Sequence, residues 1–247
     1  VHRQVDQLPL VDAARHQAVT SSRAGSGPQS AAASPECAQA SSITQRIVEA
    51  VAERARLGDP VRVLGLTGPP GTGKTTIAAE LARTLPEAGI AVAGLAPMDG
   101  FHMSNAVLAA RGIADHKGAP DTFDVGGYVA LLGRVRRADG VVLAPDYRRD
   151  LHEPVAASLP VEVDGVVITE GNYLGLELPG WADVRGLIDL LVFIDTPFEE
   201  LASRLIDRHV SFGRDRADAA HWVRTVDTAN MALVDHTKER ADLVLSL

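Results

Sequence analysis

Residues 68–75 read GPPGTGKT, which matches the phosphate-binding pattern G-x-x-x-x-G-K-[ST]. The apolar run VRVLGLTG precedes this pattern and the helix-like run KTTIAAELARTL follows from its end, so it lies between a predicted strand and a predicted helix. In such a loop the glycines turn backbone N–H groups toward phosphates, Lys74 brings a positive charge to the β- and γ-phosphates, and the Thr75 hydroxyl binds Mg²⁺. An ordinary Gly-Pro turn would not place a lysine and a threonine in register at this junction. The predicted nucleotide-binding residues are Gly68, Gly71, Thr72, Gly73, Lys74, Thr75 and Thr76, and the predicted cofactors are ATP and Mg²⁺.

A second residue that could do chemistry is Asp99, in the stretch MDGFHMSN, which follows the apolar run IAVAGLA. In a parallel sheet this strand would end at the same edge as the phosphate-binding loop, where ligands bind. A carboxylate there can accept the proton of an alcohol while the alcohol attacks the γ-phosphorus. We therefore predict that Asp99 is a general base. The alternative is that Asp99 only opens a turn with Gly100, as Asp-Gly pairs often do, and both interpretations can hold together.

The rest of the sequence helps to separate the classes of protein that share this loop. A ring-forming ATPase would carry an apolar strand ending in Asp-Glu, but VVITEG ends in Glu-Gly and LVFIDT ends in Asp-Thr. A GTPase would carry Asn-Lys-x-Asp, and the nearest text, HTKER, lacks the aspartate. A transporter ATPase would carry a Ser-Gly-Gly signature, which the sequence does not contain. These differences favour a kinase that acts on small molecules.

Five segments resemble the phosphoribulokinase/uridine kinase group of P-loop kinases, which includes bacterial pantothenate kinase. They are MDGFHMSN, KGAPDTFDV, APDYRRDLHEP, VVITEGNYL and RLIDRHVSFGR, in the order that the group has them, and the resemblance extends over residues 60–247. It is greatest for a subgroup of nucleoside kinase-like or fructose-transport-associated kinases. The resemblance implies a reaction class, transfer of a phosphoryl group to a hydroxyl, and leaves the acceptor open.

The resemblance also implies which residues contact the acceptor, and several of them have a simpler alternative. An isolated histidine such as His102 is often structural, Lys117 is either a partner for an anion or a solvated loop residue, and the cluster DYRRD could be an ordinary charged surface. The implied acceptor contacts are Phe101, His102, Asn105, Tyr147, Arg148, Asp150 and Glu170.

Two further groups of charged residues are expected near the phosphates. Glu170 ends a buried-looking strand where the group keeps an acidic residue near Mg²⁺, so the implied metal residues are Thr75 and Glu170. Arg204 and Arg208 are four residues apart and share one face of a helix, which the resemblance places in a lid over the transferred phosphoryl. The alternative is that these arginines form salt bridges with nearby acidic residues. The predicted catalytic residues are Asp99, Lys74, Arg204 and Arg208.

The elements expected to position these residues alternate between strands and helices. Repeated β-α-β units with continuous apolar strands predict a three-layer α-β-α fold with a mainly parallel sheet and a helical lid. The predicted strands are 61–68, 90–96, 141–145, 164–171, 189–196 and 242–247, and the predicted helices are 43–57 with Ser42 as its cap, 74–85, 123–138, 197–210 and one near 216–235.

The composition limits domain number and partners. The chain has 247 residues, a net charge of −8 and a single cysteine, which excludes an internal disulfide framework. Residues 1–40 are rich in Ser, Ala, Gly and Pro and predict a disordered tail, followed by one P-loop kinase domain over residues 41–247. The acidic balance argues against a nucleic-acid partner, and no apolar run is long enough to span a membrane. We expect a cytoplasmic protein with a small-molecule substrate, and a homodimer is left open.

The predicted function is transfer of the γ-phosphoryl group of ATP to a hydroxyl of a sugar, a nucleoside or a pantothenate-like alcohol. One alternative is an ATPase that uses hydrolysis as a conformational signal. A second alternative is a nucleotide-binding module without catalytic activity. The sequence leaves the identity of the acceptor open, because the loops that shape its pocket cannot be packed from the sequence.

Overall fold

The structure of the protein, a computed structural model, describes residues 35–211 and 213–247. Most of the predicted tail therefore lies outside the described residues. The first helix, α1, extends over Pro35–Arg56 and so begins several residues before the predicted cap at Ser42. Its apolar residues Ile43, Ile47 and Val51 are buried, as the predicted helical face requires.

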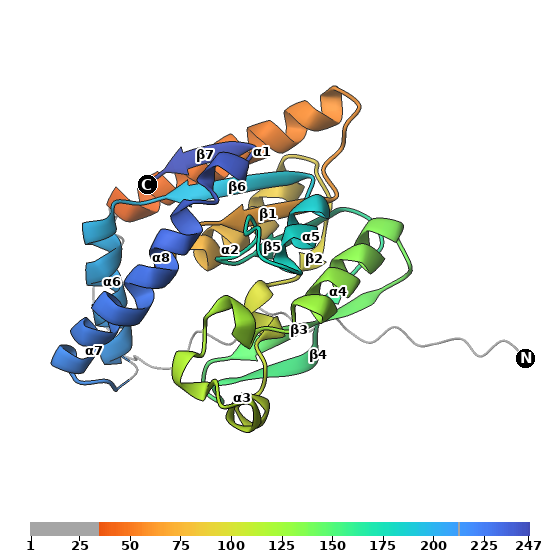
Figure 1. The fold of residues 1–247 in the computed structure, drawn as a ribbon. Helices are drawn as coiled ribbons and strands as arrows, with labels where there is room; N and C mark the ends of the chain where they lie inside the picture. The colour runs from red at the N-terminus through yellow and green to blue at the C-terminus, as the bar shows by residue number, and fades with distance from the viewer. Residues whose placement is uncertain (1–34, 212) are drawn as a thin grey trace, which may run out of the picture. The chain divides into compact units, whose positions relative to one another are not determined.

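The centre of the fold is a sheet of five parallel strands (Figure 1). The strands are β1 (Val63–Thr67), β2 (Val92–Leu95), β5 (Val166–Glu170), β6 (Leu190–Asp195) and β7 (Leu243–Ser246). Their order across the sheet is β2-β5-β1-β6-β7. Strands β1 and β5 are neighbours, so the loop after β1 and the residue that ends β5 meet at one edge of the sheet.

Helices cover both faces of this sheet, which confirms the predicted three-layer arrangement. Helices α1 and α2 (Lys74–Glu87) pack on one face through a buried aliphatic cluster that includes Ile47 and Leu81. Helices α4 (Val125–Arg137) and α5 (Trp181–Gly186) pack on the other face in a second cluster that also contains most of the buried aromatic residues. Burial of aliphatic side chains from both strand faces provides most of the stabilisation.

One predicted strand belongs to a different sheet. The sequence assigns residues 141–145 to the alternating strands and helices of the main sheet. In the structure, β3 (Val142–Arg148) instead pairs in antiparallel fashion with β4 (Glu153–Val161), a strand that the sequence did not predict. The physical reason is that only one face of this hairpin is buried, through residues such as Val142 and Val161. The polar segment that follows the predicted strand forms the end of β3 and the hairpin turn. The hairpin brings this segment to the candidate site.

The helices after β6 form a unit at the same edge of the sheet as the phosphate-binding loop. It consists of α6 (Phe198–Ser211), α7 (Arg216–Trp222), a π-helical turn (Val223–Asp227) and α8 (Thr228–Asp235), which together form the helical lid. These elements share a small core made of Leu201, Leu205, Val223 and Met231. The remaining elements are α3 (Asn105–Arg111) and the 3₁₀ turns Met98–Phe101, Ala114–His116, Pro120–Thr122 and Lys238–Arg240.

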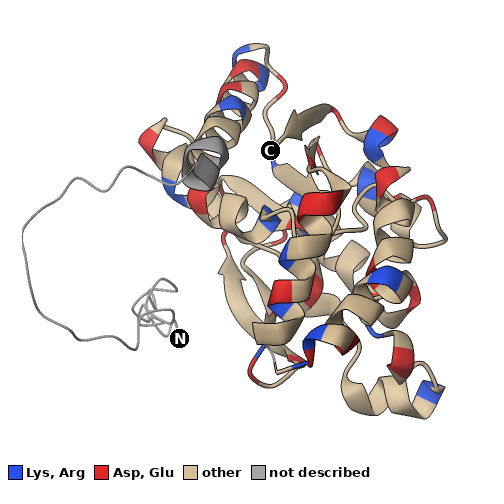
Figure 2. Cartoon of the chain, turned by 90° about the vertical axis from the view of Figure 1, so that its left-hand side faces the viewer, with Lys and Arg blue, Asp and Glu red and all other residues tan. Residues whose placement is uncertain are grey.

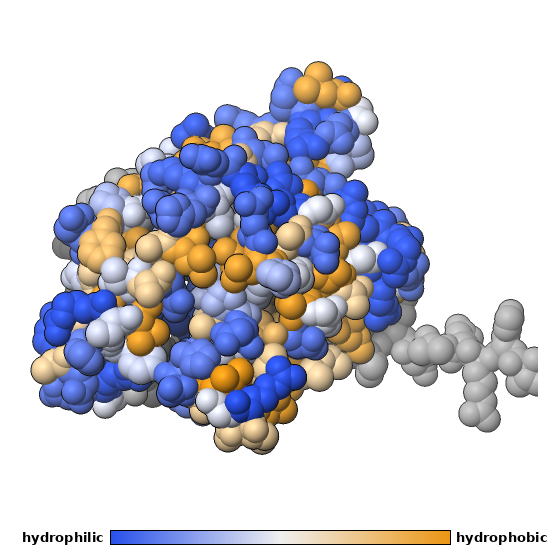
Figure 3. Space-filling model, in the orientation of Figure 1, coloured by the Kyte–Doolittle hydropathy of each residue, from blue (hydrophilic) through white to orange (hydrophobic). Residues whose placement is uncertain are grey.

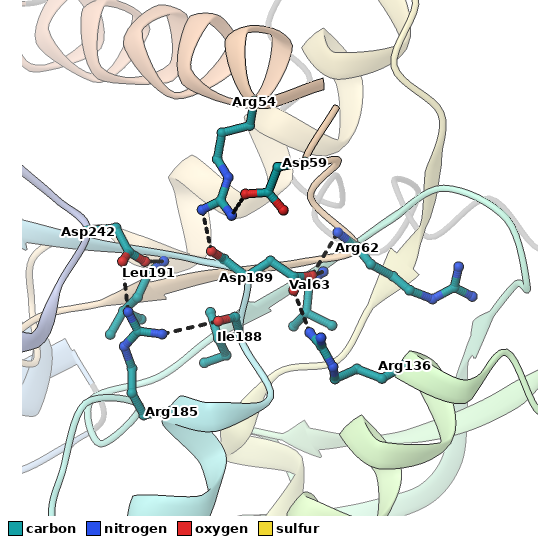
Figure 4. A network of polar contacts seen from close by, with 10 residues as sticks. All are labelled: Arg54, Asp59, Arg62, Val63, Arg136, Arg185, Ile188, Asp189, Leu191 and Asp242. Carbon is teal, nitrogen blue, oxygen red and sulfur yellow. Dashed lines mark hydrogen bonds and ion pairs between the residues drawn. The ribbon is translucent and has the colours of Figure 1, made fainter. Parts of the chain in front are cut away.

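The opposite edge of the sheet is held by a network of paired charges centred on Asp189 (Figure 4). The Asp189 carboxylate accepts hydrogen bonds from the backbone N–H groups of Arg62 (2.9 Å) and Val63 (2.8 Å) and pairs with Arg136. Arg54 donates to the Asp189 carbonyl. These contacts connect α1, β1, α4 and the start of β6, so this edge is fixed by interactions within the protein.

Charge and hydropathy are distributed over the surface without one dominant patch in the views shown. Basic and acidic residues are interspersed over the face in Figure 2. Hydrophobic residues gather across the middle of the face in Figure 3, between more hydrophilic regions above and below. Among the described residues, no helix is long and apolar enough to cross a bilayer.

Candidate functional site

The phosphate-binding loop connects β1 to α2 and is shaped by internal hydrogen bonds. Gly68 has φ = 143°, and a side chain there would meet the Ile194 carbonyl oxygen of β6 at 2.5 Å, so glycine is required. The Lys74 ammonium donates to the carbonyl oxygens of Gly68 (2.8 Å) and Pro69 (2.7 Å) and lies 3.3 Å from the Thr72 hydroxyl. The lysine is thus held inside the loop with its charge beside the backbone turn.

Next to this loop lies Glu170, the last residue of β5. Its Oε1 accepts a hydrogen bond from the Thr75 hydroxyl at 3.1 Å. Burial raises the pKa of Glu170 to about 7, with a further increase from the negative charge of Asp99. Burial also lowers the pKa of Lys74 to about 8, against the attraction of Glu170 and Asp99. A buried cation and a buried carboxyl group therefore face one another beside a hydroxyl group, an arrangement suited to binding phosphate and a divalent cation.

Asp99 reaches the same place from β2, through the 3₁₀ turn Met98–Phe101. Two glycines allow this close packing. A side chain at Gly100 would lie 2.3 Å from the Pro145 carbonyl oxygen of β3, and one at Gly171 would lie 2.4 Å from Met98. The glycine after each carboxylate thus lets the Asp99 turn pack between the end of β5 and the hairpin β3–β4.

His102 lies beside Asp99 in an aromatic environment. Its ring stacks on Phe123, with centroids 4.0 Å apart, and lies 5.0 Å from the Tyr147 ring. Its Nε2 is 4.0 Å from Asp99 Oδ1, and only 11% of its side chain is exposed. Burial lowers the pKa of His102 to about 4, so its imidazole is neutral near pH 7. A neutral histidine there leaves the negative charge of the aspartate in place.

These residues line one cavity of about 690 Å³, large enough for a nucleotide and a small acceptor. Arg208, His209, Arg214 and Asp227 of the helical lid close one of its sides. His209 Nε2 lies 2.9 Å from Asp227, and the Arg214 guanidinium lies 4.3 Å from the centre of the Trp222 ring. Of the predicted residues, the cavity is lined by Gly71, Gly73, Lys74, Thr75, Thr76, Asp99, His102, Tyr147, Glu170 and Arg208.

Comparisons with known proteins agree with this geometry. The family model described as an AAA domain matches residues 64–220. YggC from Escherichia coli is 35% identical over 188 residues, which cover 75% of this chain and 77% of YggC. The uridine kinase of Leuconostoc citreum is 29% identical over 187 residues, 74% of this chain and 86% of that enzyme.

A solved structure extends the likeness to three dimensions. The crystal structure described as a fructose transport system kinase from Silicibacter sp. is 32% identical and superposes with a TM-score of 0.75, over 81% of this chain and 98% of its own. The chain belongs to the uridine kinase-like P-loop kinases. This confirms the family predicted from the sequence and its enzyme class, a phosphotransferase with an alcohol group as acceptor.

Several predicted site residues of this P-loop kinase lie outside the cavity. Phe101 is buried in the core against Tyr128, with ring centroids 4.8 Å apart. Arg148 and Asp150 bond to each other on the outer side of the hairpin, with Arg148 Nη2 2.8 Å from Asp150 Oδ2. For these three residues the structure favours the structural or surface alternative over direct contact with the acceptor.

Three others are near the cavity without lining it. Gly68 and Thr72 shape the phosphate-binding loop without lining the cavity. The Thr72 hydroxyl donates to the Pro69 carbonyl at 3.0 Å. Asn105 begins α3 and accepts a hydrogen bond from Lys117. Its contribution to the site is therefore to position that lysine.

The two predicted lid arginines differ in whether they line the cavity. Arg208 lines the cavity, and its pKa is lowered by partial burial and by the positive charge of Arg149. Arg204, one helical turn earlier, pairs with Glu200 on α6 and is not among the lining residues. The salt-bridge alternative thus describes Arg204, whereas Arg208 is the arginine that lines the cavity.

The structure also brings in residues that the sequence did not assign. Arg149 lines the cavity where Arg148 was predicted, and Phe123 and Tyr173 form its aromatic wall. No pattern in the sequence marked Arg149, because β3 ends at Arg148 and Arg149 lies in the turn that follows. Tyr173 follows Glu170 in the stretch EGNYL, and nothing in that stretch marks it as a wall of the site.

Proposed function

We propose that this kinase transfers the γ-phosphoryl group of ATP to a hydroxyl of a small metabolite bound beside Asp99. The observation that carries the proposal is that the Asp99 carboxylate lies in the same cavity as the phosphate-binding loop and Glu170, with a neutral His102 next to it. This arrangement supports Asp99 as the base for an acceptor bound next to the terminal phosphate.

On the donor side, the backbone of the loop and Lys74 bind the β- and γ-phosphates. Lys74 is buried and hydrogen-bonded to loop carbonyls. Binding of the phosphates provides the negative charge that offsets the cost of burying this ammonium. Nucleotide binding is therefore expected to stabilise the loop and the start of α2.

Thr75 and Glu170 are the residues that would hold Mg²⁺. Their hydroxyl and carboxylate oxygens are already close together, and hard oxygen ligands are those that Mg²⁺ prefers. When bound, Mg²⁺ would neutralise charge on the phosphate oxygens. Glu170 needs its ionised form for this role, so its raised pKa predicts weaker support of the metal in acidic solution.

In the transfer step, Asp99 accepts the proton of the acceptor hydroxyl. The hydroxyl oxygen forms a bond to the γ-phosphorus, and the bond between that phosphorus and the bridging oxygen of ADP breaks. Arg208 stabilises the charge that develops on the equatorial phosphoryl oxygens. His102 packs beside Asp99, and the aromatic wall made by Phe123 and Tyr173 limits access of water.

An ATPase that uses hydrolysis as a signal is the second candidate, since the matching family model is described as an AAA domain. Such a reaction would need a residue that activates water at the phosphate. Strand β5 ends in Thr169 and Glu170 instead of an Asp-Glu pair, and the rest of the cavity offers room for an acceptor. We therefore favour transfer to an alcohol.

The proposal is tested with γ-³²P-labelled ATP and a panel of sugars, nucleosides and hydroxy acids. We expect labelled product on at least one alcohol together with matching release of ADP. Label that appears only as inorganic phosphate, at a rate that no alcohol changes, would support the ATPase instead. Tight ATP binding with neither product would support a binding module.

A further inference from the structure

Lysine is rare in this chain, and the three lysines have different surroundings. Lys74 is in the phosphate-binding loop, and Lys238 forms an ion pair with Asp195 at 2.6 Å. Lys117 lines the cavity, on the side away from the loop. Among the described residues, no carboxylate forms an ion pair with it, and its hydrogen bonds are made to neutral oxygens.

Lys117 is nevertheless held in place. Its ammonium donates to Asn105 Oδ1 and to the carbonyl oxygen of His152, both at 2.7 Å, and lies 5.3 Å from the centre of the Tyr147 ring. These contacts connect α3, the segment after it and the hairpin turn. A long side chain fixed by three elements and facing a cavity is pre-organised to bind a ligand.

Arg149 supplies a second positive charge at the same hairpin. Its neighbours Arg148 and Asp150 pair with each other on the outer side, whereas Arg149 faces the cavity. No ion pair between Arg149 and any described carboxylate is present. Its charge lowers the pKa of Arg208 and that of Glu170, and all three residues line the same cavity.

We propose that the phosphoryl acceptor is an alcohol that carries an anionic group, a carboxylate or a phosphate, which binds between Lys117 and Arg149. This inference rests on the proposed function and names the class of its acceptor. An anionic group can form charge-assisted hydrogen bonds with both cations, and these are stronger than the hydrogen bonds that a neutral group would form.

The same charges determine how such an acceptor is oriented. Asp99 and Glu170 lie at the phosphate-loop end of the cavity and repel an anion. Lys117 attracts it from the side of the cavity away from the loop, and Arg149, whose charge also acts on Glu170, attracts it from the hairpin. The anionic group therefore binds away from Asp99, and the hydroxyl of the same molecule points toward it.

The first test is binding of matched pairs that differ in one charged group. The pairs are glycerate and glycerol, gluconate and glucose, and fructose 6-phosphate and fructose, each titrated with the Mg²⁺ complex of a non-hydrolysable ATP analogue present at saturation. The analogue fills the γ-phosphate position, so an anion cannot bind there. We expect an increase in Tm with at least one anionic member and with no neutral member. The carboxylate and phosphate pairs show which anion the site prefers.

The second test compares Arg149→Gln and Lys117→Gln with Arg148→Gln as the matched control. For the best anionic acceptor we expect KM to rise at least about tenfold in the first two variants. The control should keep the wild-type KM, because its side chain faces away from the cavity. Equal Tm values for the three variants without ligands would show that the effect is on binding.

Three outcomes would overturn the inference while leaving the proposed function intact. One is equal binding and equal turnover of the neutral and anionic members of each pair. The second is a fall in kcat that is the same for neutral and anionic acceptors in Arg149→Gln, which would assign Arg149 to the transferred phosphoryl. The third is failure of every anion to raise Tm. Failure of the proposed function is a different result, the absence of label on any alcohol.

Discussion

Both edges of the central sheet carry charged residues, but these residues are paired within the protein at one edge and not at the other. At the edge where the strands begin, Asp189 and Asp242 are each matched to an arginine and to backbone N–H groups (Figure 4). At the edge where they end, Lys74 and Glu170 are buried with shifted pKa values, and Arg149 faces open space. The first arrangement stabilises the fold, and the second leaves charges free to act on ligands.

This difference separates stability from activity within one sheet. Charges that are paired within the protein lower the free energy of the folded state and are not available to bind a substrate. Charges that are buried or unmatched cost stability until a ligand arrives. Substitutions where the strands begin should therefore lower stability and leave activity unchanged, whereas substitutions where the strands end should lower activity.

Lys74→Ala should have the largest effect on activity. It removes the only lysine of the phosphate-binding loop, and the backbone N–H groups alone cannot offset the charge on the γ-phosphate. We expect phosphoryl transfer to fall by more than about 10³-fold. Steady-state kinetics checks this, with circular dichroism to show that the fold is retained. Wild-type turnover in this variant would remove the kinase assignment.

Arg208→Ala should reduce kcat by about 10²-fold, because its guanidinium faces the cavity and the transferred phosphoryl. Arg204→Ala is the matched control on the same helix face, one turn earlier and paired with Glu200. We expect it to change kcat less than about threefold. Similar losses in both variants would show that α6 acts through its stability and that the distinction between the two arginines is wrong.

Asp189→Ala should affect stability and leave chemistry unchanged. The substitution leaves two backbone N–H groups and Arg136 without their acceptor, at a cost of about 3 kcal/mol in the free energy of unfolding. Urea denaturation measures this, and kcat well below Tm should equal the wild-type value. The control is Asp59→Ala, whose exposed pair with Arg54 should contribute less than about 1 kcal/mol. A large fall in kcat would mean that the two edges are coupled.

His102 gives the smallest expected effect, which depends on pH. Its pKa is about 4 in the folded protein against an ordinary value of 6.5. Above pH 6.5 the imidazole is neutral in both states, but between pH 6.5 and 4 only the unfolded chain binds the proton. The free energy of unfolding therefore falls as the pH falls, by about 2 kcal/mol at pH 5. His102→Phe, which keeps an aromatic ring beside Phe123, should lose less stability than the wild type between pH 7 and 5. Parallel curves for both proteins would contradict this.

The donor half of the site could be predicted from the sequence because a short motif encodes it. Lys74 and Thr75 have their roles set by spacing within one loop, and Glu170 is located by the apolar strand that it ends. Local hydrogen bonds and strand order are enough to bring them together. Asp99 was located by the same argument about strand ends.

The acceptor half could be predicted only in outline. It is made of a hairpin whose second strand is mostly exposed, so the sequence lacks the apolar pattern that would reveal β4. Without the hairpin, the side of the chain on which Arg148 and Arg149 point could not be decided. The position of Lys117 depends on hydrogen bonds to Asn105 and to the carbonyl of His152. Both partners are distant from Lys117 in the sequence, so no local pattern encodes these contacts.

The most direct test of the account is turnover and ATP affinity measured on the same variant, Asp99→Asn. An asparagine keeps the shape and the turn, but its amide cannot accept the proton of the acceptor. We expect kcat to fall about 10²–10⁴-fold while the Kd for Mg·ATP stays near the wild-type value. A Kd that rises together with a modest loss of rate would place Asp99 among the groups around the metal. Turnover close to that of the wild type would contradict the claim that the two halves of the site meet at Asp99.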